Sequence, residues 1–159
     1  MEKELVKDLD SATNDLVGSQ TLYRAVDASA VFGNITDSQY DNLVNNLVYG
    51  DNQAYTLRQI NGLVDNAVGK TITDKGFMST TKDYAIAKDW GDFSGSNRSI
   101  VLEIKTSKTT KGLDLAKKAS NLNDRMEQSE VLLKRNQSYK VKSISTKDGN
   151  IYVQVEMQS

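Results

Sequence analysis

The sequence contains no cysteine and no histidine. Without cysteine the chain has no disulfide, no thiolate nucleophile and no cysteine-ligated zinc or iron–sulfur site. Without histidine it has no imidazole to act as a general base, as a member of a catalytic triad or as a metal ligand. Any chemistry must therefore depend on carboxylates, amides, hydroxyls, tyrosines, lysines and arginines.

The chain also lacks a strong charge of either sign and a long apolar run. Its 159 residues carry 20 basic and 21 acidic side chains, whereas duplex DNA binding usually requires a clear excess of lysine and arginine. No apolar stretch approaches the ~20 residues of a membrane-spanning helix, and the first ten residues lack the apolar segment of a signal peptide. We therefore expect no nucleic-acid partner and no membrane span. The absence of cysteine leaves the compartment open.

Helices are expected mainly in the first half of the chain. Four segments have apolar residues at helical spacing and are predicted to be helices: 2–17, 36–50, 53–69 and 82–90. The second opens with a capping box formed by Thr36 and Gln39, and we expect a hydroxyl side chain to cap the fourth.

Strands are expected mainly in the second half. Short β-branched or aromatic runs predict strands at 21–26, 76–81, 99–105, 129–135, 139–145 and 150–157. The last two are joined across Asp148 and Gly149, which is a hairpin signal. This order predicts an α+β fold with an antiparallel sheet assembled late in the chain. No repeat or proline-rich linker divides the chain, so we expect one domain over residues 1–159.

Two small clusters contain residues suited to binding an anion or a polar partner. Arg24 lies beside Tyr23 in a predicted strand, and a half-buried guanidinium needs an anion or a carboxylate as its partner. A structural pair with an aspartate satisfies that need equally well. Ser79, Thr80 and Thr81 follow one another at the end of a predicted strand. Their hydroxyls can bond neighbouring side chains, although capping the next helix is the simpler explanation for this cluster alone.

A third cluster, at residues 127–130, contains carboxylates and an amide. Strand alternation places Gln128 and Glu130 on one side and Glu127 and Ser129 on the other. A carboxylate beside a bound sugar stabilises an oxocarbenium-like transition state, and a neutral amide can hold an acceptor. A solvated edge-strand face is the alternative, and a one-residue bulge would turn Glu127 toward the cleft instead of Gln128. The opposite faces of Glu127 and Glu130 argue against a carbohydrate hydrolase.

In chain order these clusters resemble the ADP-ribosyltransferase family of bacterial and phage exoenzymes, whose hallmarks are an arginine, a Ser-Thr-Ser-like strand and a glutamate. The similar segments are LYR (22–24), GFMSTT (76–81), IVLEIKTSKTTKGLDL (100–115) and EQSEVLL (127–133). The third hydroxyl differs, because Thr81 stands where the family has serine. The resemblance implies a split β-sandwich with N-terminal helices, divided into an N-terminal helix (1–20) and an NAD-binding core (21–159). It also implies NAD as a substrate and no metal.

The resemblance implies specific roles for these residues. Glu130 would bond the nicotinamide-ribose 2′-hydroxyl and stabilise the oxocarbenium, Ser79 would orient Glu130, and Gln128 would position the acceptor. Arg24 would bind the NAD phosphates. The aromatic and the arginine that the family places near nicotinamide and phosphate correspond by loop order to Phe93 and Arg98, although Phe93 fits a packing role equally well. The implied cofactor-binding set is Arg24, Tyr23, Thr80, Thr81, Phe93 and Arg98.

The expected function is mono-ADP-ribosyl transfer from NAD to a protein side chain, with NAD glycohydrolase activity as a side reaction. Gln128, two residues before the glutamate, goes in this family with asparagine-type acceptors, whereas glutamate there goes with arginine. The segment 119–125 lacks the aromatic that contacts the substrate in Rho-modifying members, which argues against Rho as the target. The implied partner is a host protein. The protein itself is expected to be a monomer, either a secreted or delivered effector that acts in the host cytosol or a phage-associated protein. The alternative is a catalytically silent module of a phage particle or toxin.

Overall fold

The computed structural model of the chain describes residues 2–50, 54–93, 97–115 and 129–158. Its described helices are α1 (Glu2–Ala12), α2 (Ser29–Phe32), α3 (Asp37–Leu47), α4 (Ala54–Ala67) and α5 (Tyr84–Phe93). Its described strands are β1 (Asp15–Leu16), β2 (Thr21–Asp27), β3 (Thr71–Asp74), β4 (Met78–Thr81), β5 (Ser99–Lys105), β6 (Lys111–Asp114), β7 (Glu130–Leu133), β8 (Gln137–Lys147) and β9 (Asn150–Met157). These elements confirm the predicted α+β class.

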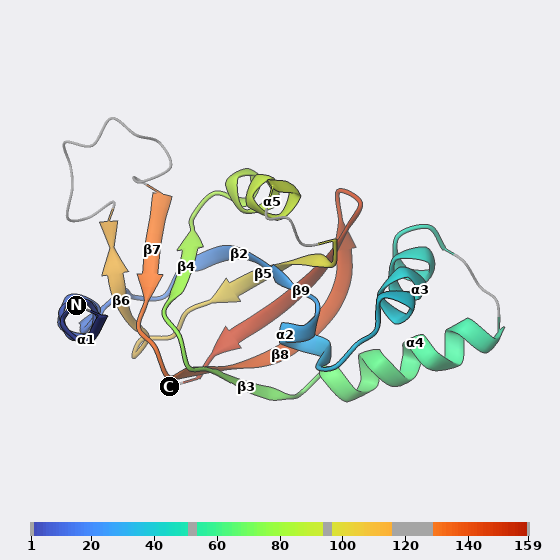
Figure 1. Cartoon of the computed structure of the whole chain (residues 1–159), viewed down its shortest axis with the longest axis horizontal. Helices are drawn as coiled ribbons and strands as arrows, with labels where there is room; N and C mark the ends of the chain where they lie inside the picture. The colour runs from blue at the N-terminus through green and yellow to red at the C-terminus, as the bar shows by residue number, and fades with distance from the viewer. Residues whose placement is uncertain (1, 51–53, 94–96, 116–128, 159) are drawn as a thin grey trace.

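All of the described strands belong to one hydrogen-bonded sheet with the order β1-β6-β7-β4-β2-β5-β9-β8-β3 (Figure 1). Neighbouring strands are antiparallel except for β5 and β9, which run parallel, so the expectation of an antiparallel sheet is wrong at this pair. The hairpin fixes β9 opposite to β8, and β5 has its direction from its antiparallel pairing with β2. Alternation in the sequence gives no information on strand direction, and for this reason the parallel pair was not foreseen.

The sheet is divided into two parts at β2. β2 pairs with β5 from Thr21 to Asp27, but it meets β4 through one residue pair, Tyr23 and Thr81. One part therefore comprises β1, β6, β7 and β4, and the other comprises β2, β5, β9, β8 and β3. The predicted site residues Arg24 and Ser79 lie on β2 and β4, the two strands that meet at this junction, and Glu130 lies on β7, the other neighbour of β4.

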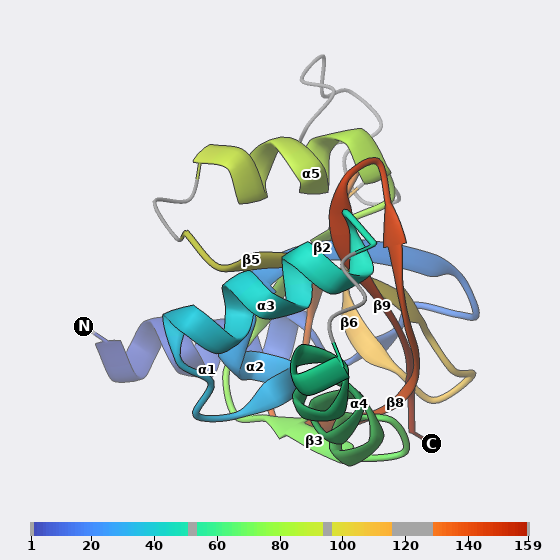
Figure 2. The same cartoon turned by 90° about the vertical axis from the view of Figure 1, so that its right-hand side faces the viewer.

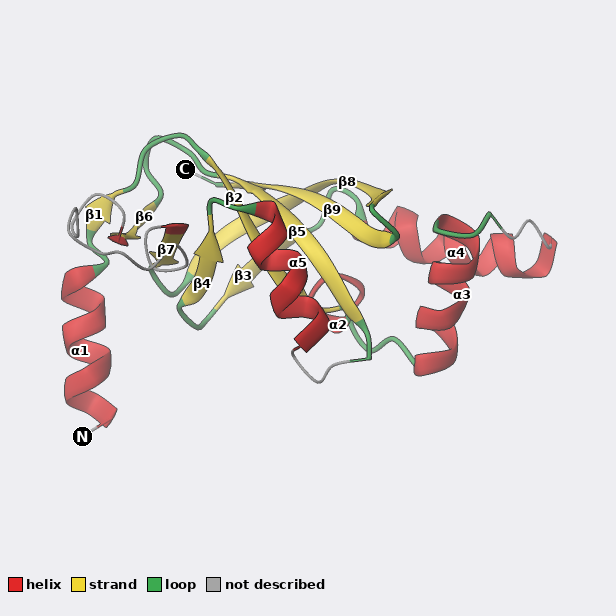
Figure 3. Ribbon diagram, turned by 90° about the horizontal axis from the view of Figure 1, so that it is seen from above, coloured by secondary structure: helices red, strands yellow, loops and turns green. Residues whose placement is uncertain are grey.

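The helices lie around the sheet in separate groups. α1 lies at one end of the sheet and α3 and α4 lie at the other (Figure 3). α5 lies across β2 and β5, on the opposite side of β2 from α4 (Figure 2). Buried apolar side chains from the strands form most of the core, including Leu22, Ile100, Leu102, Ile104, Val131, Leu133, Val153 and Val155. Within the described part of the chain, no helix combines the length and apolarity needed to cross a membrane.

Two local sequence signals are confirmed and one boundary is corrected. The Thr36 hydroxyl accepts from the Gln39 N–H, and the Gln39 side chain accepts from the Thr36 N–H, which completes the capping box of α3. Asp148 and Gly149 both have positive φ angles, as a tight hairpin turn requires. α1 ends at Ala12 and not at residue 17, because the chain enters β1 at Asp15 and pairs with β6. The short elements α2, β3 and β6 were not predicted.

Candidate active site

The hydroxyl of Ser79 is bonded to the carboxylate of Glu130. β4 and β7 are antiparallel neighbours in which Thr81 faces Glu130, so Ser79 lies one diagonal step from that glutamate. Ser79 Oγ donates to Glu130 Oε1 at 2.7 Å, a short distance typical of a hydroxyl bonded to a charged oxygen. This bond fixes the orientation of the Glu130 carboxylate at the start of β7.

The other two hydroxyls in this strand have separate roles. Thr80 is buried, and its hydroxyl donates to the Val131 carbonyl at 2.6 Å, which adds a side-chain link between β4 and β7. Thr81 Oγ1 accepts from the Asp83 N–H at 3.1 Å. The predicted hydroxyl cap of the following helix is replaced by a carboxylate, because Asp83 Oδ1 accepts from the Ala85 N–H in the first turn of α5.

Arg24 of β2 lies against the backbone of β4. Its Nη1 donates to the Ser79 carbonyl at 3.0 Å, so Ser79 contacts both Arg24 and Glu130. Arg24 Nε is buried and has no hydrogen-bond partner within the described residues. No described carboxylate forms an ion pair with Arg24, so the structural alternative of an aspartate partner is not observed in this part of the chain. A buried guanidinium donor without an acceptor is costly and favours an anionic ligand.

Tyr139, which sequence reasoning did not select, lies in the electrostatic environment of Arg24. Its side chain is buried in β8, and burial raises its pKa to about 12. The charge of Asp74 raises this pKa further, whereas the Arg24 guanidinium lowers it. The phenol is therefore neutral at physiological pH. The sequence carried no distinct signal for it, because a tyrosine in a strand is usually a core residue.

Tyr23 lies on the opposite side of β2 from Arg24. Its register partner on β5 is Glu103, whereas the partner of Arg24 is the buried Leu102. The Tyr23 ring packs edge-on against Tyr84 of α5, with the ring centroids 5.7 Å apart. Burial and, to a smaller extent, the charge of Glu103 raise the pKa of Tyr23. The contacts that hold Tyr23 are thus aromatic contacts beneath α5.

Arg98 is held by acidic side chains near the end of β2. Its Nη2 lies 2.9 Å from Asp27 Oδ2, its Nη1 lies 3.4 Å from Asp37 Oδ1, and Nη1 also donates to the Ile35 carbonyl. The hydrogen bond to Asp27 is the main cause of the raised pKa of Arg98. These contacts connect β2 to the start of α3, and none of them involves Ser79 or Glu130. The Phe93 side chain lies outside the described residues, as do Glu127 and Gln128.

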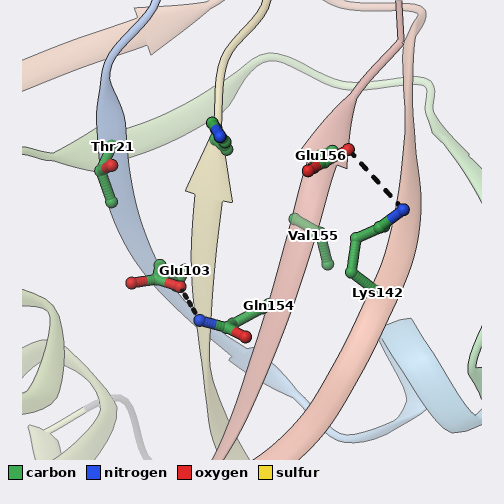
Figure 4. Close-up of a pocket in the computed structure, with 7 residues that line it drawn as sticks. Thr21, Glu103, Lys142, Gln154, Val155 and Glu156 are labelled. Atoms are coloured by element: carbon green, nitrogen blue, oxygen red, sulfur yellow. Dashed lines mark hydrogen bonds and ion pairs between the residues drawn. The ribbon is translucent and has the colours of Figure 1, made fainter.

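A separate cavity of about 310 Å³ opens on one side of β2, β5, β9 and β8 (Figure 4). We call this side, which carries Glu103 and Gln154, the outer face. Its polar lining residues are Thr21, Glu103, Lys105, Lys142, Gln154 and Glu156. The Gln154 amide donates to Glu103, and Lys142 Nζ lies 3.9 Å from Glu156, so much of this polar surface is satisfied internally. The cavity contains none of the predicted site residues. In the described segments no three carboxylates are grouped as a metal site would require.

Comparison with protein families agrees with this arrangement. A family model described as ADP-ribosyltransferase exoenzyme matches residues 2–158. The chain belongs to this exoenzyme family. The resemblance inferred from the clusters in the sequence is thereby confirmed. No curated protein matches the chain at a significant level.

Solved structures of ADP-ribosyltransferase toxins share the fold of this family member. C3stau2 from S. aureus, solved with NAD, is 21% identical with a TM-score of 0.66, and the match covers 99% of this chain and 71% of that one. Plx2a from Paenibacillus larvae is 17% identical with a TM-score of 0.65, covering 98% and 70%. BECa from C. perfringens, solved with NADH, is 16% identical with a TM-score of 0.67, covering 98% and 35%. The predicted split-sandwich fold is confirmed by these matches.

Proposed function

We propose that the protein is a mono-ADP-ribosyltransferase that uses NAD as its substrate and releases nicotinamide. The observation that carries the proposal is the hydrogen bond between Ser79 and Glu130, with Arg24 bonded to the same serine. In the reaction the bond between the ribose C1′ and the nicotinamide nitrogen breaks, and nicotinamide leaves with the electron pair. A bond forms between C1′ and the acceptor atom, which gives up a proton. The NAD and NADH in the related structures support this choice of substrate.

In this proposal Arg24 and Glu130 act on different parts of NAD. The guanidinium of Arg24 binds the pyrophosphate, because its planar fork is permanently charged and its buried Nε needs an acceptor. The Glu130 carboxylate bonds the 2′-hydroxyl of the nicotinamide ribose and stabilises the positive charge that develops on that sugar. Ser79 holds Glu130 in the orientation that this requires, and Thr80 and Thr81 brace β4.

The proposed acceptor is an asparagine or glutamine side chain of a host protein. Gln128 precedes Glu130 by two residues, and a carboxamide can dock another carboxamide through reciprocal hydrogen bonds. We propose delivery to the host cytosol, since the related structures include toxins. Arg98 is a weaker candidate than Arg24 for binding the NAD phosphates, because its guanidinium is already paired with Asp27 and Asp37. Tyr23 is likewise a weaker candidate for binding NAD, because its ring packs against Tyr84 of α5.

Nicotinamide release from NAD without added acceptor tests the proposal. Wild type is expected to release nicotinamide, and Glu130→Ala to lose the activity by at least about a hundred-fold, because electrostatic stabilisation of the transition state is removed. Glu156→Ala is a matched control on β9, and its release should equal that of wild type. Near-normal release by Glu130→Ala would refute the role of Glu130. Neither release nor NAD binding by wild type would favour the silent binding module.

Gln128→Ala tests the acceptor proposal separately. We expect transfer to an asparagine-containing acceptor to fall while nicotinamide release in the absence of acceptor is retained. The reason is that Gln128 is assigned to the acceptor and not to NAD. An equal loss of both activities would mean that Gln128 acts on the NAD side.

A further inference from the structure

Glu130 occupies a position in the sheet that needs support. It is the first residue of β7, and strand ends are held by fewer hydrogen bonds than strand centres. Any catalytic group must keep its place to within a fraction of an ångström. The contacts that hold the start of β7 therefore bear directly on the reaction proposed above.

Lys82 holds the start of β7 through its backbone. Lys82 follows β4 directly, and its N–H donates to the Ser129 carbonyl at 2.8 Å. Thr81, the preceding residue, is the register partner of Glu130. The antiparallel pairing of β4 and β7 is thus extended by one bond beyond Glu130.

The side chain of Lys82 reaches a different strand. Its Nζ lies 2.9 Å from Asp114 Oδ2, close enough for an ion pair although not aligned as a hydrogen bond. Asp114 is the last residue of β6, where it faces Val131 of β7. Because β7 lies between β6 and β4, Lys82 connects the two neighbours of β7 at the end where Glu130 lies (Figure 1).

Asp114 depends strongly on this lysine. Its side chain is only 5% exposed, whereas that of Lys82 is 34% exposed. Neither carboxylate oxygen receives a hydrogen bond from the described residues. A buried carboxylate is tolerated only when its charge is compensated, so the ammonium of Lys82 is held close to β6.

We propose that Lys82 and Asp114 form a positioning pair that fixes the start of β7 and thereby the Glu130 carboxylate. This inference rests on the proposed function, because it assigns the pair to the step that Glu130 catalyses. Neither residue contacts the reacting atoms. Loss of the pair should lower the rate of bond breaking without weakening the binding of NAD, which is assigned to Arg24.

The double variant Lys82→Met with Asp114→Leu tests the pair. Replacing both charges by apolar groups of similar size leaves no buried charge unpaired, so the variant should fold. We expect kcat for nicotinamide release to fall about a hundred-fold, with KM for NAD nearly unchanged, because a small displacement of a catalytic group has an effect of this size. Lys82→Arg, which keeps the ion pair, should retain most of the activity. An unchanged kcat in a folded double variant would overturn the proposal.

Hydrogen exchange provides a readout that does not require activity. The amides of residues 130–133 should exchange faster in the double variant than in wild type, whereas those of β8 and β9 should not change. Lys142→Gln with Glu156→Gln removes an ion pair elsewhere on the sheet and is the matched control. Unchanged exchange in β7 would refute the positioning pair even if wild type proved inactive. If wild type released no nicotinamide while exchange in β7 was faster in the double variant, the proposed function alone would be refuted. If the double variant does not fold, Asp114→Glu decides: it keeps both charges but moves the carboxylate, so an unchanged kcat would refute positioning.

Discussion

Ser79 contacts the two charged residues of the proposed site through different atoms. Its side-chain hydroxyl donates to Glu130, and its main-chain carbonyl accepts from Arg24. A substitution at position 79 therefore removes one contact and leaves the other in place. This separation allows the orientation of Glu130 to be tested without disturbing Arg24.

Ser79→Ala should lower the rate of nicotinamide release but leave NAD affinity nearly unchanged. A hydrogen bond to a charged group contributes about 2 kcal/mol, which corresponds to roughly a thirty-fold loss of rate. Steady-state kinetics and calorimetric titration with NAD measure the two quantities. Ser143→Ala, which removes a hydroxyl bonded to Gln154 on the outer face, is the control. Lost affinity with an unchanged rate would contradict the assigned role of Ser79.

Tyr139 should make stability depend on pH in the alkaline range. Its pKa is about 12 in the folded chain because of burial, against the ordinary 10.0. Between these values the unfolded chain loses its tyrosine proton while the folded chain keeps it, so stability is retained below pH 10 and falls as the pH rises toward 12. Urea unfolding at a series of pH values should show this fall, and it should be smaller in Tyr139→Phe. Identical profiles for the two proteins would contradict the raised pKa.

At the scale of elements, β6 and β7 approach each other closely at Gly112. A Cβ added there would lie 2.6 Å from the Leu132 carbonyl oxygen and 3.0 Å from Val17 Cγ1. The first of these atoms belongs to the backbone of β7 and cannot move without shifting that strand. Glycine is thus required at this position by the spacing of the strands and not by its backbone angles.

Gly112→Ala is expected to destabilise the protein by about 2 kcal/mol, because overpacking between two paired strands forces the backbone apart. Chemical denaturation measures the change. Gly62→Ala in α4 is the matched control, since nothing lies within 4 Å of its added Cβ and alanine favours a helix. The control should be stabilised by up to about 1 kcal/mol. Equal stability of wild type and Gly112→Ala would show that the strands can separate at little cost.

Long periodic segments and side-chain chemistry could be predicted from the sequence, but contacts through the backbone could not. Arg24, Ser79 and Glu130 were selected by type and order, and the structure brings them together at the junction of the two sheet parts. Nothing in the sequence indicated that Arg24 bonds a main-chain carbonyl, because every residue has one. The ion pairs of Arg98 could not be predicted for a different reason: its two aspartates come from segments that approach each other only in the folded chain. Short elements such as β3 and β6 are too brief for periodicity to reveal them.

At the scale of the whole molecule, α1 is attached to the end of β4 and β7 that lies away from Glu130. Asp10 receives two hydrogen bonds from Arg135, at 2.9 and 2.6 Å, and its carbonyl accepts from Lys134 Nζ. Arg135 also lies over the ring of Phe77, just before β4. One aspartate thus connects the first helix to the turn after β7, and Arg135 extends this contact to Phe77 at the same end of β4.

Asp10→Asn should loosen α1 without reducing nicotinamide release. The pair is partly exposed, so the loss of stability should be at most about 1 kcal/mol. Faster hydrogen exchange in α1, with unchanged release of nicotinamide, is the expected result. A large loss of release would show that the attachment of α1 controls the site.

The central place of β9 in the sheet has a consequence for synthesis on the ribosome. β9 lies between β5 and β8, although it is the last strand in sequence. As the chain emerges from its N-terminal end, β5 can pair with β2, but its other edge stays open until Met157 has left the ribosome. Open strand edges invite pairing with other chains. For as long as β9 is missing, the emerging chain therefore exposes the edge of β5 to pairing with other chains, a route to aggregation that closes only when β9 inserts beside β5.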